Sequence, residues 1–298
     1  MTPATLKPWR ALSLGNSAEV WLARDHEGGL GLVKRLRPAL RGDAEARAAF
    51  IAEATLHAAV DHPHIVRAFG HGVDADGPWL TLEYVDGVSA AVLIARGTTL
   101  SSAAVAAVGS DVASALAALH SGVAARGHRD AVVHRDLSPA NLVHDVNGTT
   151  KLTDFGAARR LDGTTISRTI VGDVGYQAPE VCAGDSAGPE SDVYALGVIL
   201  FELATGGLPV RASSPAAIVA ATIAGEVIDP AVAVPPLAPW LATVLRGVLQ
   251  RHGADRPSAA ALAADLGAHV DPAARTELMS QVVAGPDALD ATETRPRR

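Results

Sequence analysis

The sequence predicts an α+β protein of two lobes, a small β-rich N-terminal lobe with one main helix and a larger, mostly helical C-terminal lobe. Three observations support this fold class. Apolar and polar residues alternate over residues 9–36 and again over 65–87, as they do in strands. Between these stretches, residues 43–60 are rich in helix formers. From about residue 101 to about residue 270 the pattern is mostly helical.

Turn and capping residues mark the elements of the N-terminal lobe. The glycine pair at 28–29 interrupts the first alternating stretch and predicts a hairpin turn. Asp43 stands where a helix N-cap is expected, and Pro63 follows the helix, so both ends of the main helix are marked. The Asp-Ala-Asp-Gly cluster at 74–77 predicts the turn between two further strands.

Two apolar segments predict helices in the C-terminal lobe. Over residues 101–120, valines and leucines recur three and four positions apart behind two serines, which is typical of a capped helix. The segment at 193–206, "VYALGVILFELATG", is too short to span a bilayer and is predicted as a buried core helix. We therefore predict no membrane span.

The predicted boundaries follow from these changes of pattern. Beyond Pro272 the sequence predicts a short helix and then a mobile tail, because apolar periodicity is weak there. A ligand is expected in the cleft between the lobes. The predicted parts are an N-terminal extension over 1–9, one domain over 10–270 with an N-lobe at about 10–83, a hinge at about 84–88 and a C-lobe at about 89–270, and a partly disordered tail over 271–298.

Composition limits the function classes. The chain has 298 residues, 48% of them hydrophobic, which suits a globular protein with a sizeable core. Its formal net charge of -7 argues against a surface that wraps nucleic acid, so no nucleic-acid partner is predicted. A single cysteine, Cys182, permits no intramolecular disulfide and predicts a cytoplasmic location and a small buried apolar role.

The tripeptide His-Arg-Asp occurs twice, ending at Asp130 and at Asp136. Phosphoryl transfer from ATP needs a proton acceptor beside the attacking hydroxyl and a magnesium ligand a short loop away. Asn141 lies five residues after Asp136, whereas Arg135 lies five residues after Asp130 and would repel a metal. Pro139 restricts the second loop further. Only the second copy is therefore predicted to act, and the first is predicted to be a polar loop insertion.

A second carboxylate follows this loop. Asp154 lies thirteen residues after Asn141, at the end of "LVHDVNGTTKLT", which reads as a hairpin with Asn147 and Gly148 in its turn. Such a hairpin returns the chain to the cleft. We therefore predict that Asp154 and Asn141 ligate the same magnesium ion.

With "HRDLSPAN", "LTDFGAARR", "GYQAPE" and "SDVYALGVILFELATG" in this order, the sequence resembles the eukaryotic-type (Hanks-type) protein kinases of the Ser/Thr class found in bacteria. The resemblance covers about residues 10–270. It implies a bilobal kinase fold and transfer of the ATP γ-phosphoryl group to Ser or Thr hydroxyls, with Mg²⁺ or Mn²⁺ as cofactor. It also implies a protein substrate and self-association for autophosphorylation in trans.

The resemblance assigns roles to individual residues. Asp136 is the implied base, Lys34 the cation at the α- and β-phosphates, and Glu53 the carboxylate that pairs with Lys34. Asn141 and Asp154 are the implied metal ligands. The implied ATP-binding residues are Leu12, Gly15, Ala18, Val20, Lys34, Leu82, Glu83 and Val85, the last two through their backbone groups.

Other matched residues have structural or regulatory roles in such kinases. Glu180 is expected to pair with Arg256, and Asp192 to brace the catalytic loop. Arg135 is expected to bind a phosphate on the activation loop. The candidate phosphorylation sites on that loop are Thr164, Thr165, Ser167 and Thr169.

Some positions depart from the family pattern. Ser13 and Ala18 stand at glycine positions of the phosphate-binding turn, Ser138 stands where a lysine is usual, and Asp173 where a threonine is usual. Two alternatives therefore stay open, a pseudokinase that binds nucleotide or partners, and a small-molecule phosphotransferase with an "HGDxxxxN" loop. The complete set of charged residues favours an active enzyme, and "GYQAPE" favours a protein kinase.

Overall fold

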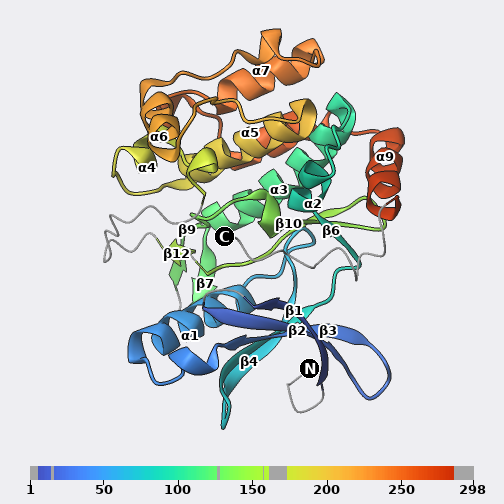
Figure 1. Cartoon of the computed structure of the whole chain (residues 1–298), viewed down its shortest axis with the longest axis vertical. Helices are drawn as coiled ribbons and strands as arrows, with labels where there is room; N and C mark the ends of the chain where they lie inside the picture. The colour runs from blue at the N-terminus through green and yellow to red at the C-terminus, as the bar shows by residue number, and fades with distance from the viewer. Residues whose placement is uncertain (1–5, 15–16, 126–127, 157, 161–172, 285–298) are drawn as a thin grey trace.

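The computed structural model describes residues 6–14, 17–125, 128–156, 158–160 and 173–284. Two lobes are visible in Figure 1, the N-terminal lobe in blue to cyan below and the C-terminal lobe in green to red above. The predicted α+β arrangement is confirmed, because one antiparallel sheet and one main helix form the smaller lobe while helices dominate the larger.

The N-lobe is built on a five-stranded antiparallel sheet in the order β1-β2-β3-β5-β4. Helix α1 (Ala44–Ala58) packs on it, and the Asp43 carboxylate caps this helix by accepting the N–H groups of Glu45 and Ala46. Gly28 turns the β2–β3 hairpin with a φ of +88°, which glycine adopts without steric cost. The strands are β1 (Lys7–Leu14), β2 (Ala18–Arg24), β3 (Leu30–Leu36), β4 (Ala68–Asp74) and β5 (Gly77–Glu83).

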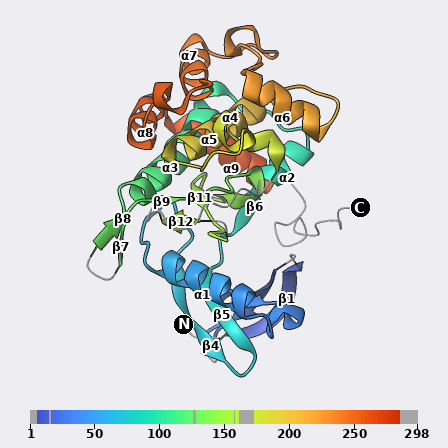
Figure 2. The same cartoon turned by 90° about the vertical axis from the view of Figure 1, so that its left-hand side faces the viewer.

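The C-lobe surrounds two buried helices, α3 (Ser102–His120) and α5 (Pro189–Thr205). Among the described residues, α3 is the helix long and apolar enough to span a membrane, and 67% of its apolar window is buried inside the protein. The other helices, several of which are visible in Figure 2, are α2 (Ala90–Ala95), α4 (Pro179–Cys182), α6 (Pro215–Ala224), α7 (Pro239–Val248), α8 (Ala259–Gly267) and α9 (Pro272–Val283).

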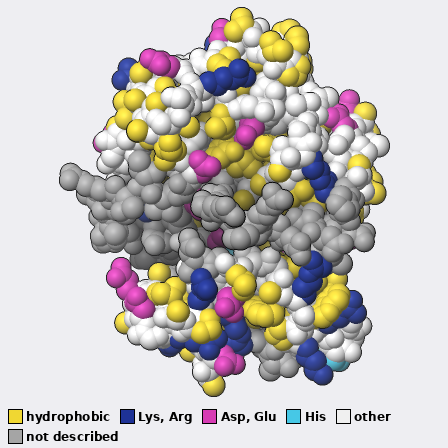
Figure 3. All heavy atoms as spheres, in the orientation of Figure 1, with side chains coloured by type: hydrophobic (Ala, Val, Ile, Leu, Met, Phe, Trp, Pro, Cys, Tyr) yellow, Lys and Arg dark blue, Asp and Glu magenta, His cyan; other side chains and the backbone are white. Residues whose placement is uncertain are grey.

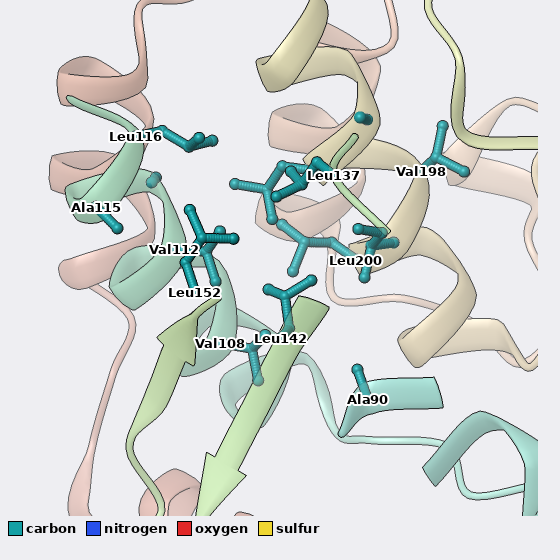
Figure 4. Close-up of a cluster of buried hydrophobic side chains, with 14 of the residues drawn as sticks. Ala90, Val108, Val112, Ala115, Leu116, Leu137, Leu142, Leu152, Val198 and Leu200 are labelled. Atoms are coloured by element: carbon teal, nitrogen blue, oxygen red, sulfur yellow. The ribbon is translucent and has the colours of Figure 1, made fainter. Parts of the chain in front are cut away.

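A small sheet links the core to the cleft. Strands β10 (Leu142–Asp145) and β11 (Thr150–Leu152) form the hairpin predicted from its Asn-Gly turn, and β6 (Gly87–Ser89) pairs with β10. Leu142 and Leu152 face Val112 of α3 and Leu200 of α5 in Figure 4. All four are fully buried, and each such leucine contributes about 1.5–3 kcal/mol through burial. The hairpin is therefore seated firmly on the two core helices.

The first His-Arg-Asp copy is a strand, so its prediction as a loop is wrong. Residues His128–Asp130 form β8 and pair with β7 (Val123–Ala125), and this hairpin projects beside α3 in Figure 2. Strand pairing uses backbone N–H and C=O groups, which polar side chains leave available. The next segment, β9 (Val132–Val133), pairs with β12 (Arg159–Arg160).

Acidic and basic side chains are interspersed on the face shown in Figure 3. Dark blue and magenta groups lie on both lobes of that face, and no field of one charge covers it. This distribution agrees with the mixed charge of the sequence, 25 Lys and Arg against 32 Asp and Glu.

Two buried histidines predict loss of stability in acid. Burial lowers the pKa of His57 and of His144 to about 4, against about 6.5 in an unfolded chain. The unfolded state therefore binds more protons below pH 6.5, and stability falls as the pH drops from about 6.5 to about 4, by about 3 kcal/mol for each histidine. Urea unfolding at several pH values should show that the free energy of unfolding of His144→Leu depends less steeply on pH than that of wild type. His26→Leu removes an exposed histidine and is the control, and equal slopes for wild type and His144→Leu would contradict this account.

Candidate active site

Three charged side chains from separate elements meet between the lobes. Lys34 lies on β3, and its Nζ donates to Glu53 Oε1 of α1 at 2.6 Å. The same Nζ donates to Asp154 Oδ1 at 2.9 Å, and Asp154 follows β11 in the C-lobe. The structure thus joins the sheet, the main helix of the N-lobe and the C-lobe hairpin through one ammonium group.

The charges in this cluster stabilise each other. Burial alone would lower the pKa of Lys34, but the carboxylates of Asp154 and Glu53 outweigh it and hold the pKa above its usual value. Burial would raise the pKa of Asp154, and the Lys34 ammonium reverses that effect and keeps it below its usual value. Both groups are therefore charged at neutral pH.

The second His-Arg-Asp copy lies at the cleft on a braced loop. Asp192, at the start of α5, is almost fully buried, and its two carboxylate oxygens accept the backbone N–H groups of His134 and Arg135 at 2.8 and 2.9 Å. His120 Nε2 lies 2.9 Å from the same carboxylate. Buried charge-assisted bonds of this kind fix backbone position.

Asn141 is tied directly to the segment that carries Asp136. Its side-chain Nδ2 donates to the backbone carbonyl oxygen of Asp136 at 2.8 Å, and the backbone carbonyl of Asn141 accepts the Thr153 N–H at 2.9 Å. The amide oxygen of Asn141 is then the atom that this side chain can offer to a metal. Burial raises the pKa of Asp136, and the nearby Asp154 carboxylate raises it further.

Two residues of the site adopt left-handed backbone angles. Arg135 has a φ of 70° and Asp154 a φ of 65°, and these are the non-glycine residues with positive φ in the described part of the chain. Such a conformation costs about 1–3 kcal/mol and persists where surrounding contacts enforce it. Here Asp192 holds the first residue, and the Lys34 ammonium holds the second.

The donor atoms suit a magnesium ion that also binds phosphate. Lys34 and the Gly156 N–H both bond Oδ1 of Asp154, so Oδ2 is the oxygen that a metal would use. Magnesium takes one or two protein oxygens together with phosphate oxygens and water. Across the described residues, no cluster of three or more His, Cys, Asp or Glu side chains could hold a metal ion.

One family match contains most of the described chain, namely residues 9–14, 17–125, 128–156, 158–160 and 173–266. Residues 9–266 match the model of the protein kinase domain. The chain belongs to the protein kinase family. The resemblance drawn from the sequence motifs is therefore confirmed. Kinases of this family use ATP and a divalent metal.

Curated relatives are bacterial kinases. The chain is 34% identical over 212 residues to the serine/threonine-protein kinase PrkC of Bacillus subtilis, which covers 70% of this chain and 32% of that protein. It is 34% identical over 247 residues to PknJ of Mycobacterium tuberculosis, which covers 80% of this chain and 40% of that protein. It is 32% identical over 272 residues to PkaA of Streptomyces coelicolor, which covers 86% and 48% respectively. This kinase chain thus spans a third to a half of the length of these relatives.

Val20, Lys34 and Leu82, three of the residues expected to bind ATP, lie on one face of the N-lobe sheet of this kinase. Val20 pairs with Lys34 across β2 and β3, and Leu82 lies on β5 in a buried cluster with Ala18. Leu12, on β1, is half-buried. Of the other residues expected to bind ATP, Glu83 and Val85 lie at and just after the end of β5. Gly15, expected at the phosphates, is outside the described residues.

The Glu83 backbone N–H donates to the Arg67 carbonyl at 2.9 Å, so a bond from Glu83 to a purine would use its carbonyl oxygen. Its side chain pairs with Lys151 on β11. This contact links the segment between the lobes to the strand that leads to Asp154, and sequence reasoning did not find it.

A group of tilted aromatic contacts behind the charged cluster was also missed. The centroid of the Phe155 ring lies 4.4 Å from that of His57 and 5.6 Å from that of His134. His57 Nε2 lies 2.6 Å from the Val66 carbonyl oxygen. These contacts connect α1 to the loop that carries His134 and Asp136. The helical position of His57, four residues after Glu53, was the available signal.

The large-lobe residues expected to pair do meet. Arg256 donates to both Glu180 oxygens at 2.8 and 2.9 Å, and Ser191 donates to the same Glu180 at 2.7 Å. Cys182 is buried, and burial raises the pKa of its thiol to about 11, so the thiolate is scarce at neutral pH.

The activation-loop hydroxyls Thr164, Thr165, Ser167 and Thr169 lie outside the described residues. One departure from the family pattern has a local side-chain role, since the Asp173 carboxylate accepts the Gly175 N–H at 3.0 Å. Asp173 therefore caps the short helical turn Val174–Tyr176. At Ser138 the backbone carbonyl accepts the Asn141 N–H at 3.0 Å, a bond that does not depend on the side chain.

Proposed function

We propose that this domain transfers the γ-phosphoryl group of ATP to serine or threonine hydroxyls of protein substrates. The observation that carries the proposal is the convergence of Lys34, Glu53 and Asp154 beside the loop that joins Asp136 to Asn141. PrkC, PknJ and PkaA are each named serine/threonine-protein kinases, which supports the same activity and acceptor class.

In the proposed reaction the acceptor oxygen bonds to the γ-phosphorus as the bond to the β,γ-bridging oxygen breaks. Asp136 orients the hydroxyl and accepts its proton, and ADP leaves with the bridging oxygen. Lys34, held by Glu53, positions the α- and β-phosphates. Asn141 and Asp154 would hold Mg²⁺ or Mn²⁺, which neutralises phosphate charge when bound. Alignment of the two reactants then supplies much of the acceleration.

The proposal includes regulation of the kinase by phosphorylation of its activation loop. Phosphorylation of one or more of Thr164, Thr165, Ser167 and Thr169, by a second copy of the chain, would place a phosphate within reach of Arg135. Phosphate mapping of the active protein tests this, and full turnover without phosphate on that segment would contradict it. The cytoplasmic location stays a prediction.

The paired His-Arg-Asp copies provide a matched test of activity. Wild type and Asp130→Ala should both transfer labelled γ-phosphate to a protein acceptor in the presence of Mg²⁺. Asp136→Ala should lose about 10²–10⁴-fold in rate, because the proton acceptor is missing. Asp130 lies on the β7–β8 hairpin, so its removal tests the same residue type outside the cleft.

The outcome also separates the alternatives. Equal rates for wild type and Asp136→Ala would show that the signal comes from a contaminant. Magnesium-dependent ATP binding without transfer to any protein would favour a nucleotide-binding pseudokinase. Transfer to small alcohols or aminoglycosides alone would favour the small-molecule phosphotransferase.

A further inference from the structure

Helix α9 lies beyond the residues that match the kinase family model, yet it is packed into the C-lobe. It contacts α3, β10 and β6, and Figure 1 shows it in red beside the last two. Ala274, Leu278 and Val282 on one face are 1%, 0% and 4% exposed. Burial of this face stabilises the docked position.

Arg275 joins α9 to α3 and to the β10–β11 hairpin. Its guanidinium donates to both oxygens of Asp111 on α3, at 2.5 and 2.7 Å. Asp111 is only 3% exposed, so its carboxylate depends on such partners for solvation. Arg275 also donates to the Gly148 carbonyl at 2.9 Å, in the turn of the β10–β11 hairpin.

The Asp111 carboxylate is a junction between elements. Beside Arg275 it accepts the Thr150 N–H of β11 at 2.9 Å, and it lies 3.5 Å from His64 Nε2 in the segment between α1 and β4. The same His64 accepts the Leu152 N–H at its carbonyl, at 2.9 Å. One buried carboxylate thus connects α3, α9, the β10–β11 hairpin and the segment between α1 and β4.

The hairpin held at this junction lies in sequence between the two proposed metal ligands, Asn141 and Asp154. β10 begins at the residue after Asn141, and β11 ends two residues before Asp154. The backbone of α9 lies directly on the turn, because a Cβ added at Gly148 would be 2.5 Å from the Arg275 carbonyl oxygen. A shift of α9 therefore requires the hairpin turn to move as well.

The middle and the C-terminal part of α9 have further contacts with the C-lobe. Glu277 accepts the Ser101 N–H and hydroxyl at 2.8 and 2.5 Å, at the N-cap of α3. Arg96, which follows α2, donates to the Gln281 carbonyl at 3.4 Å. The helix is thus fixed along its length.

We propose that α9 holds the β10–β11 hairpin in position between Asn141 and Asp154, and that Arg275 is the positioning residue. By holding Asp111 and the Gly148 turn, it keeps Asn141 and Asp154 at the separation that a metal-bound nucleotide requires. This inference rests on the proposed function, and it places the C-terminal boundary of the catalytic unit after α9.

The test measures binding of ATP by the full chain across a range of MgCl₂ concentrations, by calorimetry. Arg275→Ala and the less disruptive Arg275→Gln should weaken magnesium-dependent ATP binding about tenfold, the usual effect of removing a residue that orients metal ligands. Binding of ATP in EDTA should stay within twofold of wild type. Arg275→Lys keeps the charge without the bidentate fork and should recover part of the loss.

Arg246→Ala is the matched control, because Arg246 pairs with Asp229 on the exposed surface and should leave both affinities unchanged. Folding is checked by thermal unfolding of each variant. A folded Arg275 variant with magnesium-dependent affinity within twofold of wild type would overturn the proposal. So would failure of both neutral variants to fold, since a positioning role needs a folded domain. An inactive wild type that still binds Mg²⁺ and ATP would reject the proposed activity and leave this test intact.

Discussion

Asp154→Asn should reduce phosphoryl transfer about a thousandfold. The substitution keeps the shape of the side chain and removes the charge that faces Lys34 and that is proposed to bind the metal. An amide oxygen binds magnesium more weakly than a carboxylate, so charge on the transferring phosphate is less well neutralised. The fold should persist, because Lys34 retains its 2.6 Å bond to Glu53.

Initial rates at saturating ATP, measured over a range of Mg²⁺ concentrations, check this expectation. Part of the lost rate should return at high Mg²⁺, which identifies weakened metal binding as the cause. Asp130→Asn makes the same chemical change outside the cleft and should keep the wild-type rate. A rate for Asp154→Asn within tenfold of wild type would show that this carboxylate is not a metal ligand.

Arg256→Ala should lower the free energy of unfolding by about 3–5 kcal/mol, the usual effect of breaking a buried ion pair. The Arg256 side chain is 0% exposed, pairs with both Glu180 oxygens and lies 4.8 Å from the Tyr194 ring centroid. Its loss leaves a partly buried carboxylate with Ser191 as its remaining side-chain partner. Backbone carbonyls also accept from this guanidinium, those of Glu190, Gln250 and Arg251.

Urea unfolding, with the free energy extrapolated to water, measures this effect. Arg246→Ala removes an arginine whose ion pair with Asp229 is exposed to solvent, and it should cost much less than Arg256→Ala. Equal losses for the two variants would mean that burial of the Glu180 pair adds nothing to stability.

Features encoded by neighbouring residues were predictable from the sequence. The cap at Asp43, the helix at 101–120 and the Asn147-Gly148 turn each need only a few consecutive residues. Spacing also separated the two His-Arg-Asp copies, since Asn141 bonds the Asp136 carbonyl while Asp130 lies on a separate hairpin.

Contacts between distant segments could not be predicted in this way. Arg275 and Asp111 are 164 residues apart, and nothing in the periodicity of either helix names the partner. The same holds for His57 and Phe155, whose contact depends on how α1 sits against the C-lobe. Periodicity identifies which face of an element is buried, and the packing of whole elements decides what that face meets.

The left-handed angles at Arg135 and Asp154 set a limit on engineering this domain. Glycine would relax both backbones, so a design method that scores conformational energy alone would select it and gain about 1–3 kcal/mol at each position. The same choice would delete the guanidinium and the carboxylate. Thermostabilised versions should therefore draw their mutations from other parts of the chain.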